Sequence, residues 1–337
     1  MEAMFYEKLD NGSVLCKLCN HRCVIKPDGY GVCKVRQNIK GVLETLVYGK
    51  LVAINPDPIE KKPLYHFMPG TLSYSVATAG CNFKCSFCQN MDISQMPRES
   101  AKIEGSLFSP EDVVLDAKRT GCKSISFTYT EPTVFFEFAY DTAKLAHEQG
   151  LKSIFVSNGY MSTEAIDAIA PYLDAANIDL KAFTEDFYKN FCGAKLEPVK
   201  KNLSYLKSKG VFLEVTTLLI PGKNDDEKEL KMMAEFIVET LGPRTPWHIS
   251  RFYPAYHMKD ISPTPVGMLS QAREIGINAG LRYVYIGNVP GHAGIHTYCP
   301  RCGKPVIKRA AYFQIDEYMI KDGCCKYCNF PIDVVEC

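Results

Sequence analysis

The chain has 337 residues, of which 46% are hydrophobic and 23% are charged, so it is long enough for one large domain with small appendages. Lysine and arginine number 39 against 38 acidic residues, and the formal net charge of +1 gives no electrostatic reason to expect nucleic acid or an anionic membrane as a partner. No run of about 18 apolar residues occurs, and the N-terminal residues MEAMFYEKLDNGSV lack the apolar core of a signal peptide. We therefore expect a cytoplasmic protein.

The chain contains 15 cysteines, and most of them are clustered. In a cytoplasmic chain of this length, clustered cysteines indicate metal sites rather than a disulfide framework. The clusters are Cys16, Cys19, Cys23 and Cys33; then Cys81, Cys85 and Cys88; then Cys299, Cys302, Cys324, Cys325 and Cys328. Cys122 and Cys192 stand apart, and burial as small hydrophobes is the simpler interpretation of both.

Strand-like and helix-like segments alternate over residues 72–290. Helix starts are indicated at Ser109-Pro110-Glu111 and at Ser162-Thr163-Glu164, and further helices are expected up to Gly150, over 225–241 and over 268–279. This alternation predicts a parallel sheet with right-handed crossovers, either a barrel or an open part of one, with its chemistry at the carboxyl ends of the strands. The expected strands are 72–78, 124–130, 152–158, 175–180, 211–220, 247–253 and 282–287.

Two flanking segments lack this alternation and are rich in cysteine. We expect an N-terminal cysteine-rich module over 1–70, the barrel over 71–292, and a C-terminal module of zinc-ribbon or rubredoxin type over 293–337. Neither appendage is long enough to hold much hydrophobic core, so bound metal is expected to stabilise each one.

The central cysteines Cys81, Cys85 and Cys88 have the spacing C-x3-C-x2-C, directly after the first expected strand. Three thiolates in one loop suit three corners of a 4Fe-4S cluster, which takes four cysteines when the protein supplies every ligand. The fourth iron is then free to bind a substrate. A structural zinc site, by contrast, normally closes with four protein ligands. The spacing therefore favours an iron–sulfur cluster with one open iron.

This string, with Phe87 as the aromatic residue before the third cysteine, resembles the motif of the radical S-adenosylmethionine (SAM) superfamily. The resemblance implies the α/β class and a partial (β/α)6-type radical SAM barrel. It also implies that the open iron binds SAM, and that one electron, from a donor such as ferredoxin or flavodoxin, cleaves SAM to a 5′-deoxyadenosyl radical. The radical would abstract hydrogen from a protein or small-molecule substrate.

Residues at several strand ends match the positions at which the superfamily holds SAM. Phe87 is expected near the adenine, and Glu131 stands where many members have Gly-Gly-Glu, although Tyr129 and Thr130 replace the glycines here. Ser157 and Asn158 are candidates for binding the ribose or carboxylate of SAM. The simpler alternative for Glu131 is an acidic residue in the first turn of a helix, where the helix dipole favours it. For Ser157 and Asn158 the simpler alternative is a structural role in a turn.

Further candidates lie at later strand ends. Asp179 and Lys181 fall on the same side of a strand and resemble the Asp-Leu-Lys of glycyl-radical-enzyme activases, so they are candidates for cofactor binding and catalysis, with a surface ion pair as the alternative. The substrate-side candidates are His248, Arg251 and His257.

The two outer cysteine groups are candidate metal sites of a different kind. Cys16, Cys19, Cys23 and Cys33 suit zinc, with a second iron–sulfur cluster as the alternative and His21 as a possible substitute ligand. The knuckles Cys299-x2-Cys302 and Cys325-x2-Cys328 indicate a zinc ribbon or a rubredoxin-like iron site. We favour Cys325 over Cys324 as the ligand because it restores the C-x2-C spacing.

Over nearly its full length the chain resembles the AmmeMemoRadiSam-system radical SAM enzymes, relatives of pyruvate formate-lyase activating enzymes. The segments that carry this resemblance are CKLCNHRC, DPIEKKPLYHFMPG, CNFKCSFCQN, FTYTEPT, NIDLKAF and TYCPRCG. It implies a Memo-like protein partner. Activation of a glycyl radical enzyme is one alternative function, and a non-catalytic metal-stapled scaffold is another. The polar residues at the strand ends argue against a scaffold.

Overall fold

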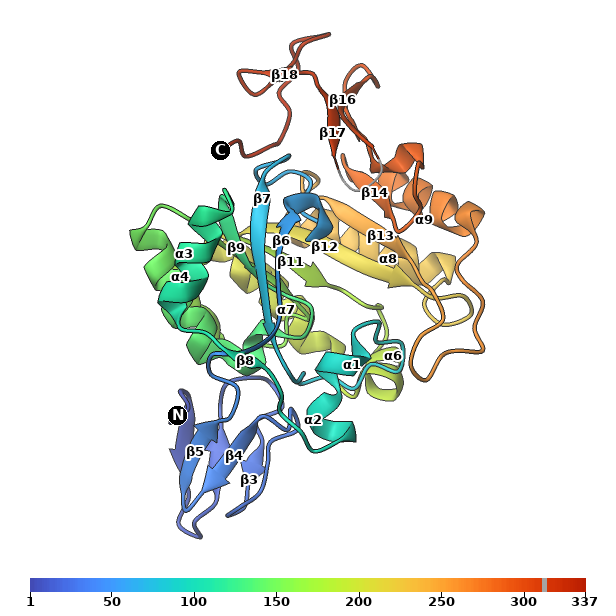
Figure 1. Ribbon diagram of the computed structural model, residues 1–337. Helices are drawn as coiled ribbons and strands as arrows, with labels where there is room; N and C mark the ends of the chain where they lie inside the picture. The colour runs from blue at the N-terminus through green and yellow to red at the C-terminus, as the bar shows by residue number, and fades with distance from the viewer. Residues whose placement is uncertain (311–313) are drawn as a thin grey trace.

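The structure is a computed structural model that describes residues 1–310 and 314–337. Its centre is a curved nine-stranded sheet with the strand order β14-β13-β12-β11-β10-β9-β7-β6-β8 (Figure 1). Each neighbouring pair within the first seven strands of that order is parallel, so the predicted α/β partial barrel is confirmed. These strands are β7 (Leu72–Thr78), β9 (Ser124–Phe127), β10 (Lys152–Ser157), β11 (Ala175–Asp179), β12 (Phe212–Leu219), β13 (Trp247–Arg251) and β14 (Val284–Gly287).

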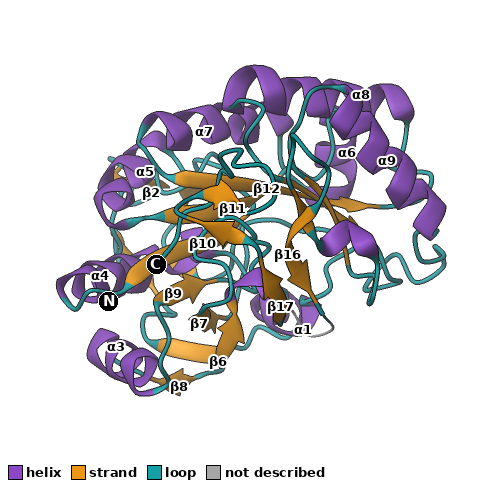
Figure 2. Cartoon of the chain, turned by 90° about the horizontal axis from the view of Figure 1, so that it is seen from above, coloured by secondary structure: helices purple, strands orange, loops and turns teal. Residues whose placement is uncertain are grey.

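Helices lie along the outer side of the sheet and bury its apolar side chains (Figure 2). Ser109 begins α3 with a capping box to Asp112, and Ser162 begins α5 by accepting a hydrogen bond from the amide of Ala165, as the sequence predicted. The main helices are α3 (Pro110–Arg119), α4 (Phe136–Glu148), α5 (Thr163–Ile169), α7 (Leu196–Ser208), α8 (Glu227–Phe236) and α9 (Val266–Asn278). Short helices are α1 (Met91–Ser94), α2 (Met96–Glu99) and α6 (Glu185–Phe187).

Two strands of the central sheet were not predicted from the sequence. Strand β6 (Lys50–Pro58), which comes from the N-terminal cysteine-rich segment, pairs antiparallel with β7 along its whole length. Its other edge pairs with β8 (Ser106–Leu107) only at Lys50 and Leu51. Prolines 56 and 58 therefore lie where that edge is unpaired, and their missing N–H groups break no sheet hydrogen bond. These prolines hide the strand from pattern-based prediction.

The N-terminal residues form a small β module that shares the core of the barrel. A buried ion pair between Arg36 of the module and Glu137 of α4 ties the module to the barrel. Its strands are β1 (Tyr6–Lys8), β2 (Val14–Cys16), β3 (Val24–Ile25), β4 (Arg36–Ile39) and β5 (Val42–Thr45).

The C-terminal residues form a second module with a small core of its own. Figure 1 shows the two modules at opposite ends of the barrel. The C-terminal strands are β15 (Thr297–Tyr298), β16 (Pro305–Arg309), β17 (Ile315–Tyr318), β18 (Ile320–Lys321) and β19 (Cys324–Cys325). In the described ranges, every helix is too short or too polar to cross a lipid bilayer.

Candidate active site

The cysteine loop leaves the carboxyl end of β7 and is held in place by backbone contacts. Gly80 has a φ of 101°, and a Cβ at this position would lie 2.6 Å from Val35 Cγ1, so only glycine fits. The amides of Lys84 and Ser86 donate to carbonyls of the π-helical turn Tyr188–Cys192, at 2.8 and 2.9 Å. The loop conformation is therefore set by its neighbours before any cluster binds.

The three thiols of this loop have hydrogen-bond donors beside them. The amide of Phe83 donates to Cys81 Sγ at 3.4 Å, and the Ser94 hydroxyl lies 3.1 Å from Cys88 Sγ. A hydrogen bond from the thiol of Cys192 lowers the pKa of Cys85, whereas burial raises the pKa of Cys81 and of Cys88. The neighbouring donors favour the thiolate, the form that binds iron, and at Cys81 and Cys88 they oppose the effect of burial.

The spacing of the thiols distinguishes the kind of metal site. Among the described residues, only Cys299, Cys302, Cys325 and Cys328 bring their ligand atoms within 4.8 Å of one another. Cys81, Cys85 and Cys88 of the cysteine loop do not converge in this way. Their wider spacing suits a polynuclear cluster in which each iron takes one thiolate. The residues present thus fit the 4Fe-4S cluster that the sequence predicted.

Asp179 and Lys181 meet beside this loop. Lys181 Nζ donates to Asp179 Oδ2 at 2.7 Å and lies 5.9 Å from the centre of the Phe87 ring. Burial lowers the pKa of Lys181, but the Asp179 carboxylate and the Cys85 thiolate raise this pKa by more than burial lowers it. The ammonium therefore stays charged. The structure therefore brings these three predicted residues together around Cys85. Phe87 itself is buried and packs on Phe187 of α6.

Glu131, Ser157 and Asn158 form a second group of predicted residues. Glu131 is fully enclosed and accepts hydrogen bonds from the hydroxyl of Ser157 at 2.7 Å and the amide of Asn158 at 2.8 Å, as well as from Thr133. Asn158 Nδ2 donates to Asn82 Oδ1 at 2.7 Å and lies 3.9 Å from Cys81 Sγ. Glu131 thus holds the end of β10 against the cysteine loop.

The Thr-Tyr-Thr-Glu segment keeps the backbone of a glycine turn without its glycines. Tyr129 has a φ of 65°, a left-handed conformation that glycine adopts more readily, and this ends β9 at Phe127 rather than at the predicted residue 130. Its carbonyl accepts a hydrogen bond from Asn90 Nδ2 of the cysteine loop at 2.9 Å. Its hydroxyl donates to Asp57, which also accepts from the buried Lys62 at 2.7 Å.

The substrate-side candidates separate in the structure. The exposed His257 lies beside the cysteine loop, because its amide donates to the carbonyl of Ser86 at 2.9 Å. Arg251 lies at the carboxyl end of β13, where its Nε donates to the carbonyl of Thr264 at 2.8 Å. Both positions are compatible with the predicted role.

His248 does not join this group. It is the second residue of β13, near the amino end of the strand, and is 2% exposed. Its Nε2 lies 2.6 Å from Glu214, and its ring stacks on Tyr285. The substrate-side role expected for His248 finds no support in this placement, because position along the strand, rather than residue type, decides which end of the barrel a side chain reaches.

Several residues of the site are not among the predicted site residues. Asn224 is buried and donates from Nδ2 to the carbonyl of Lys181 at 2.7 Å, so it braces the loop that carries the lysine. The Gly-Lys-Asn turn in which it lies was the available indication. Asn82, for which the sequence indicated no role, and Cys192, interpreted as a buried small hydrophobe, both contact cysteines of the loop after β7.

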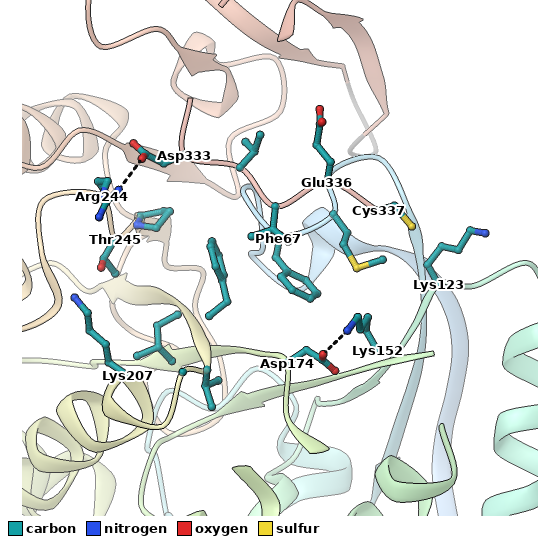
Figure 3. A pocket seen from close by; sticks show the side chains of 18 of the residues that line it. Phe67, Lys123, Lys152, Asp174, Lys207, Arg244, Thr245, Asp333, Glu336 and Cys337 are labelled. Carbon is teal, nitrogen blue, oxygen red and sulfur yellow. Dashed lines mark hydrogen bonds and ion pairs between the residues drawn. The ribbon is translucent and has the colours of Figure 1, made fainter. Parts of the chain in front are cut away.

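A large cavity lies at the other end of the barrel. This open cavity of about 930 Å3 is lined by residues at the amino ends of the strands, including Lys152, Asp174 and Thr245, and by the C-terminal tail near Asp333 (Figure 3). Because the ligands of parallel α/β sheets bind at the carboxyl ends of the strands, this cavity is not the active site.

The outer cysteines differ from one another in geometry. In the C-terminal group, Cys299 Sγ and Cys328 Sγ are 3.6 Å apart, and Cys302 Sγ and Cys325 Sγ are 3.9 Å apart. Tetrahedral zinc with bonds of about 2.3 Å separates its sulfurs by about 3.8 Å, so this group fits one metal ion. Cys325, and not Cys324, belongs to it. The N-terminal four, Cys16, Cys19, Cys23 and Cys33, line a separate small cavity.

Comparisons with known proteins agree with this site. The radical SAM superfamily model matches residues 75–236. An uncharacterized Methanocaldococcus jannaschii protein is 46% identical over 335 residues, covering 99% of both chains. A putative glycyl-radical enzyme activating enzyme of the same organism is 26% identical, covering 66% of this chain and 89% of that protein. Pyruvate formate-lyase 1-activating enzyme of Escherichia coli is 20% identical, covering 47% of this chain and 65% of that enzyme.

Residues 75–236 therefore form a radical SAM domain, and this domain is homologous to those of the activating enzymes. The family implies a 4Fe-4S cluster and SAM, and the three-cysteine loop after β7 has the ligands that such a cluster needs.

Proposed function

We propose that the protein binds SAM at a 4Fe-4S cluster held by Cys81, Cys85 and Cys88, and uses it to abstract hydrogen from a protein or small-molecule substrate. The observation that carries this proposal is the meeting of Asp179, Lys181 and Phe87 around Cys85. When bound and reduced, the cluster supplies the electron that cleaves SAM. A donor such as ferredoxin or flavodoxin is the proposed source of that electron.

The protein's own residues supply position and charge. Lys181 places a fixed positive charge beside Cys85, which stabilises the thiolate, and its own charge is balanced by Asp179. Asn158 and Asn82 hold the first cysteine in place. Phe87 and Phe187 form an apolar wall beside the loop, which excludes water from a reactive centre.

Activation of a glycyl radical enzyme is the second candidate function. It is favoured by the similarity to the activating enzymes of E. coli and M. jannaschii and by the Asp-Leu-Lys segment at the end of β11. A Memo-like partner and membership of the AmmeMemoRadiSam system are supported by the sequence resemblance alone. A cytoplasmic location is also part of this proposal.

The test is anaerobic reconstitution with iron and sulfide, followed by dithionite and SAM, with 5′-deoxyadenosine and methionine quantified by chromatography. We expect both products in equal amounts from the wild-type protein and none from Cys85→Ala. Cys122→Ala, a cysteine outside every cluster, serves as the matched control and is expected to behave as wild type. Absence of cleavage by a protein with full iron content and a reduced cluster would refute the proposal.

To test the activase alternative, the reduced protein and SAM are mixed with a glycyl radical enzyme and examined by electron paramagnetic resonance (EPR). A carbon-centred glycyl radical signal supports this function. SAM cleavage without that signal assigns the radical to a different substrate.

A further inference from the structure

The N-terminal cysteines lie together on a cavity whose chemistry is unusual. Cys16, Cys19, Cys23 and Cys33 line it with His21, Arg36 and Asn82. Two of these lining residues are almost completely buried and carry a nitrogen donor without a hydrogen-bond partner in the described chain: Arg36 Nε and Asn82 Nδ2. Buried donors of this kind are rare in native proteins, because each one loses its hydrogen bonds to water. These two donors therefore face no hydrogen-bond acceptor in the described part of the chain.

The four N-terminal sulfurs are not arranged around a single point, as the sulfurs of the C-terminal site are. The C-terminal thiols converge within 4.8 Å, as the ligands of one tetrahedral ion must, whereas the N-terminal thiols do not. In this respect they match the three cysteines of the catalytic loop. A set of thiolates spread more widely than a single ion allows suits a cluster of several irons.

The cavity volume shows that the four thiols are not collapsed around a single ion. The space between the lining residues measures about 20 Å3, and about 10–15 Å3 is enough to admit one water. Zinc bonds of about 2.3 Å are shorter than the contact distance between sulfur and water, so a collapsed tetrathiolate site has no such space. An iron–sulfur cluster contains sulfide sulfurs, which would supply hydrogen-bond acceptors for the two free donors.

The cavity also adjoins the catalytic loop. Asn82, which follows the first catalytic cysteine, forms part of its wall, and the ring of His21 lies 2.8 Å from the carbonyl of Asn82. Arg98 donates to the carbonyl of Val32 at 2.9 Å and to that of Cys81 at 3.4 Å, so one side chain spans both cysteine groups.

From these observations we propose that Cys16, Cys19, Cys23 and Cys33 bind a second iron–sulfur cluster, immediately beside the catalytic loop, rather than a zinc ion. Arg36 Nε and Asn82 Nδ2 donate to its sulfur atoms, and the positive charge of Arg36 offsets part of the negative charge of the thiolates.

The test uses the full-length chain with Cys81→Ala, Cys85→Ala and Cys88→Ala combined, so that the catalytic ligands are absent. After anaerobic reconstitution with iron, sulfide and zinc together, we expect about four irons and four acid-labile sulfides per chain to remain. Dithionite should then produce an EPR signal. Acid-labile sulfide is the deciding quantity, because a rubredoxin-like C-terminal site would bind iron without sulfide.

Adding Cys19→Ala and Cys23→Ala to this background should remove the sulfide, and adding Cys122→Ala should leave it unchanged. Circular dichroism establishes that each variant is folded. The proposal is overturned if the triple variant holds no sulfide and two zinc ions per chain. Because the triple variant cannot carry the catalytic cluster, this outcome leaves the proposed SAM chemistry untouched.

Discussion

At the scale of single residues, Glu131 shows how a buried charge can organise a site without being free to react. The sequence predicts that it contacts SAM, and this role stays a prediction. In the structure, Oε1 accepts from Thr133 and Ser157, while Oε2 accepts from the amide of Asn158 and keeps one lone pair free. Burial raises the pKa of Glu131, and these donors oppose that shift.

Replacing Glu131 by glutamine should therefore disturb the end of β10 before it affects chemistry. The glutamine NH2 group faces backbone N–H donors, and one buried donor left unpaired costs about 1–3 kcal/mol. We expect the free energy of unfolding, measured in urea, to fall by about this amount and the KM for SAM to rise. Exposed Glu148→Gln on α4 is the matched control. Unchanged stability and KM would argue that Glu131 does not organise the site.

Lys181→Met should separate charge from packing, because methionine keeps most of the side-chain volume. The ammonium stabilises the Cys85 thiolate and pairs with Asp179, and hydrogen bonds to charged groups contribute about 1.5–3 kcal/mol. We expect SAM cleavage to slow by about tenfold or more with iron content retained, as measured by 5′-deoxyadenosine formation. The control is Lys200→Met on α7, since the ion-pair partner of Lys200 is the exposed Glu197. This variant should cleave SAM at the wild-type rate. Equal rates for the two variants would contradict the proposed role.

At the scale of elements, the barrel strands and helix starts could be predicted because their patterns are local. Ser109 and Ser162 cap helices as expected, and the seven parallel strands appear in the predicted order. Strand β6 could not be predicted, since its prolines are tolerated only because one edge is largely free. The substrate-side role of His248 stays a prediction, and the position of this residue near the amino end of β13 could not be foreseen, because alternation does not reveal depth in a barrel.

The C-terminal knuckles offer a test in which the chain supplies its own control. Cys325 belongs to the group of converging thiols, whereas its neighbour Cys324 does not. We expect Cys325→Ser to lose about one metal ion per chain, because a structural site needs all four ligands. Cys324→Ser should keep its metal. Elemental analysis measures the metal content of both variants. The assignment would be reversed if Cys324→Ser lost its metal and Cys325→Ser kept it.

At the scale of the whole molecule, the two modules serve opposite ends of the barrel. The N-terminal module contacts the cysteine loop through His21 and Asn82, and the C-terminal module closes the amino-end side through a buried polar network. In that network Arg309 donates to the carbonyl of Tyr65, and His66 lies between the carbonyl of Asp333 and the hydroxyl of Tyr285. Such long-range pairing depends on the assembled fold, so no local sequence pattern could have predicted it.

His66 should make this junction sensitive to acid. Burial lowers its pKa from 6.5 to about 4, so the folded protein keeps the ring neutral where the unfolded chain takes up a proton. Its stabilising contribution is therefore complete above pH 6.5 and is lost as the pH falls towards 4, with a total of about 3 kcal/mol. Unfolding in urea at pH 7 and pH 5 measures the loss. His66→Gln should show a smaller pH dependence, and equal slopes would exclude His66 as the cause.

The central claim is that the loop after β7 holds a cluster with one iron open to SAM. EPR of the dithionite-reduced protein, recorded with and without SAM, tests it most directly. The account predicts that SAM changes the cluster signal in the wild-type protein, and that the Cys81→Ala, Cys85→Ala and Cys88→Ala triple variant shows no SAM-dependent change. Identical spectra with and without SAM, from wild-type protein with its full complement of iron, would contradict it.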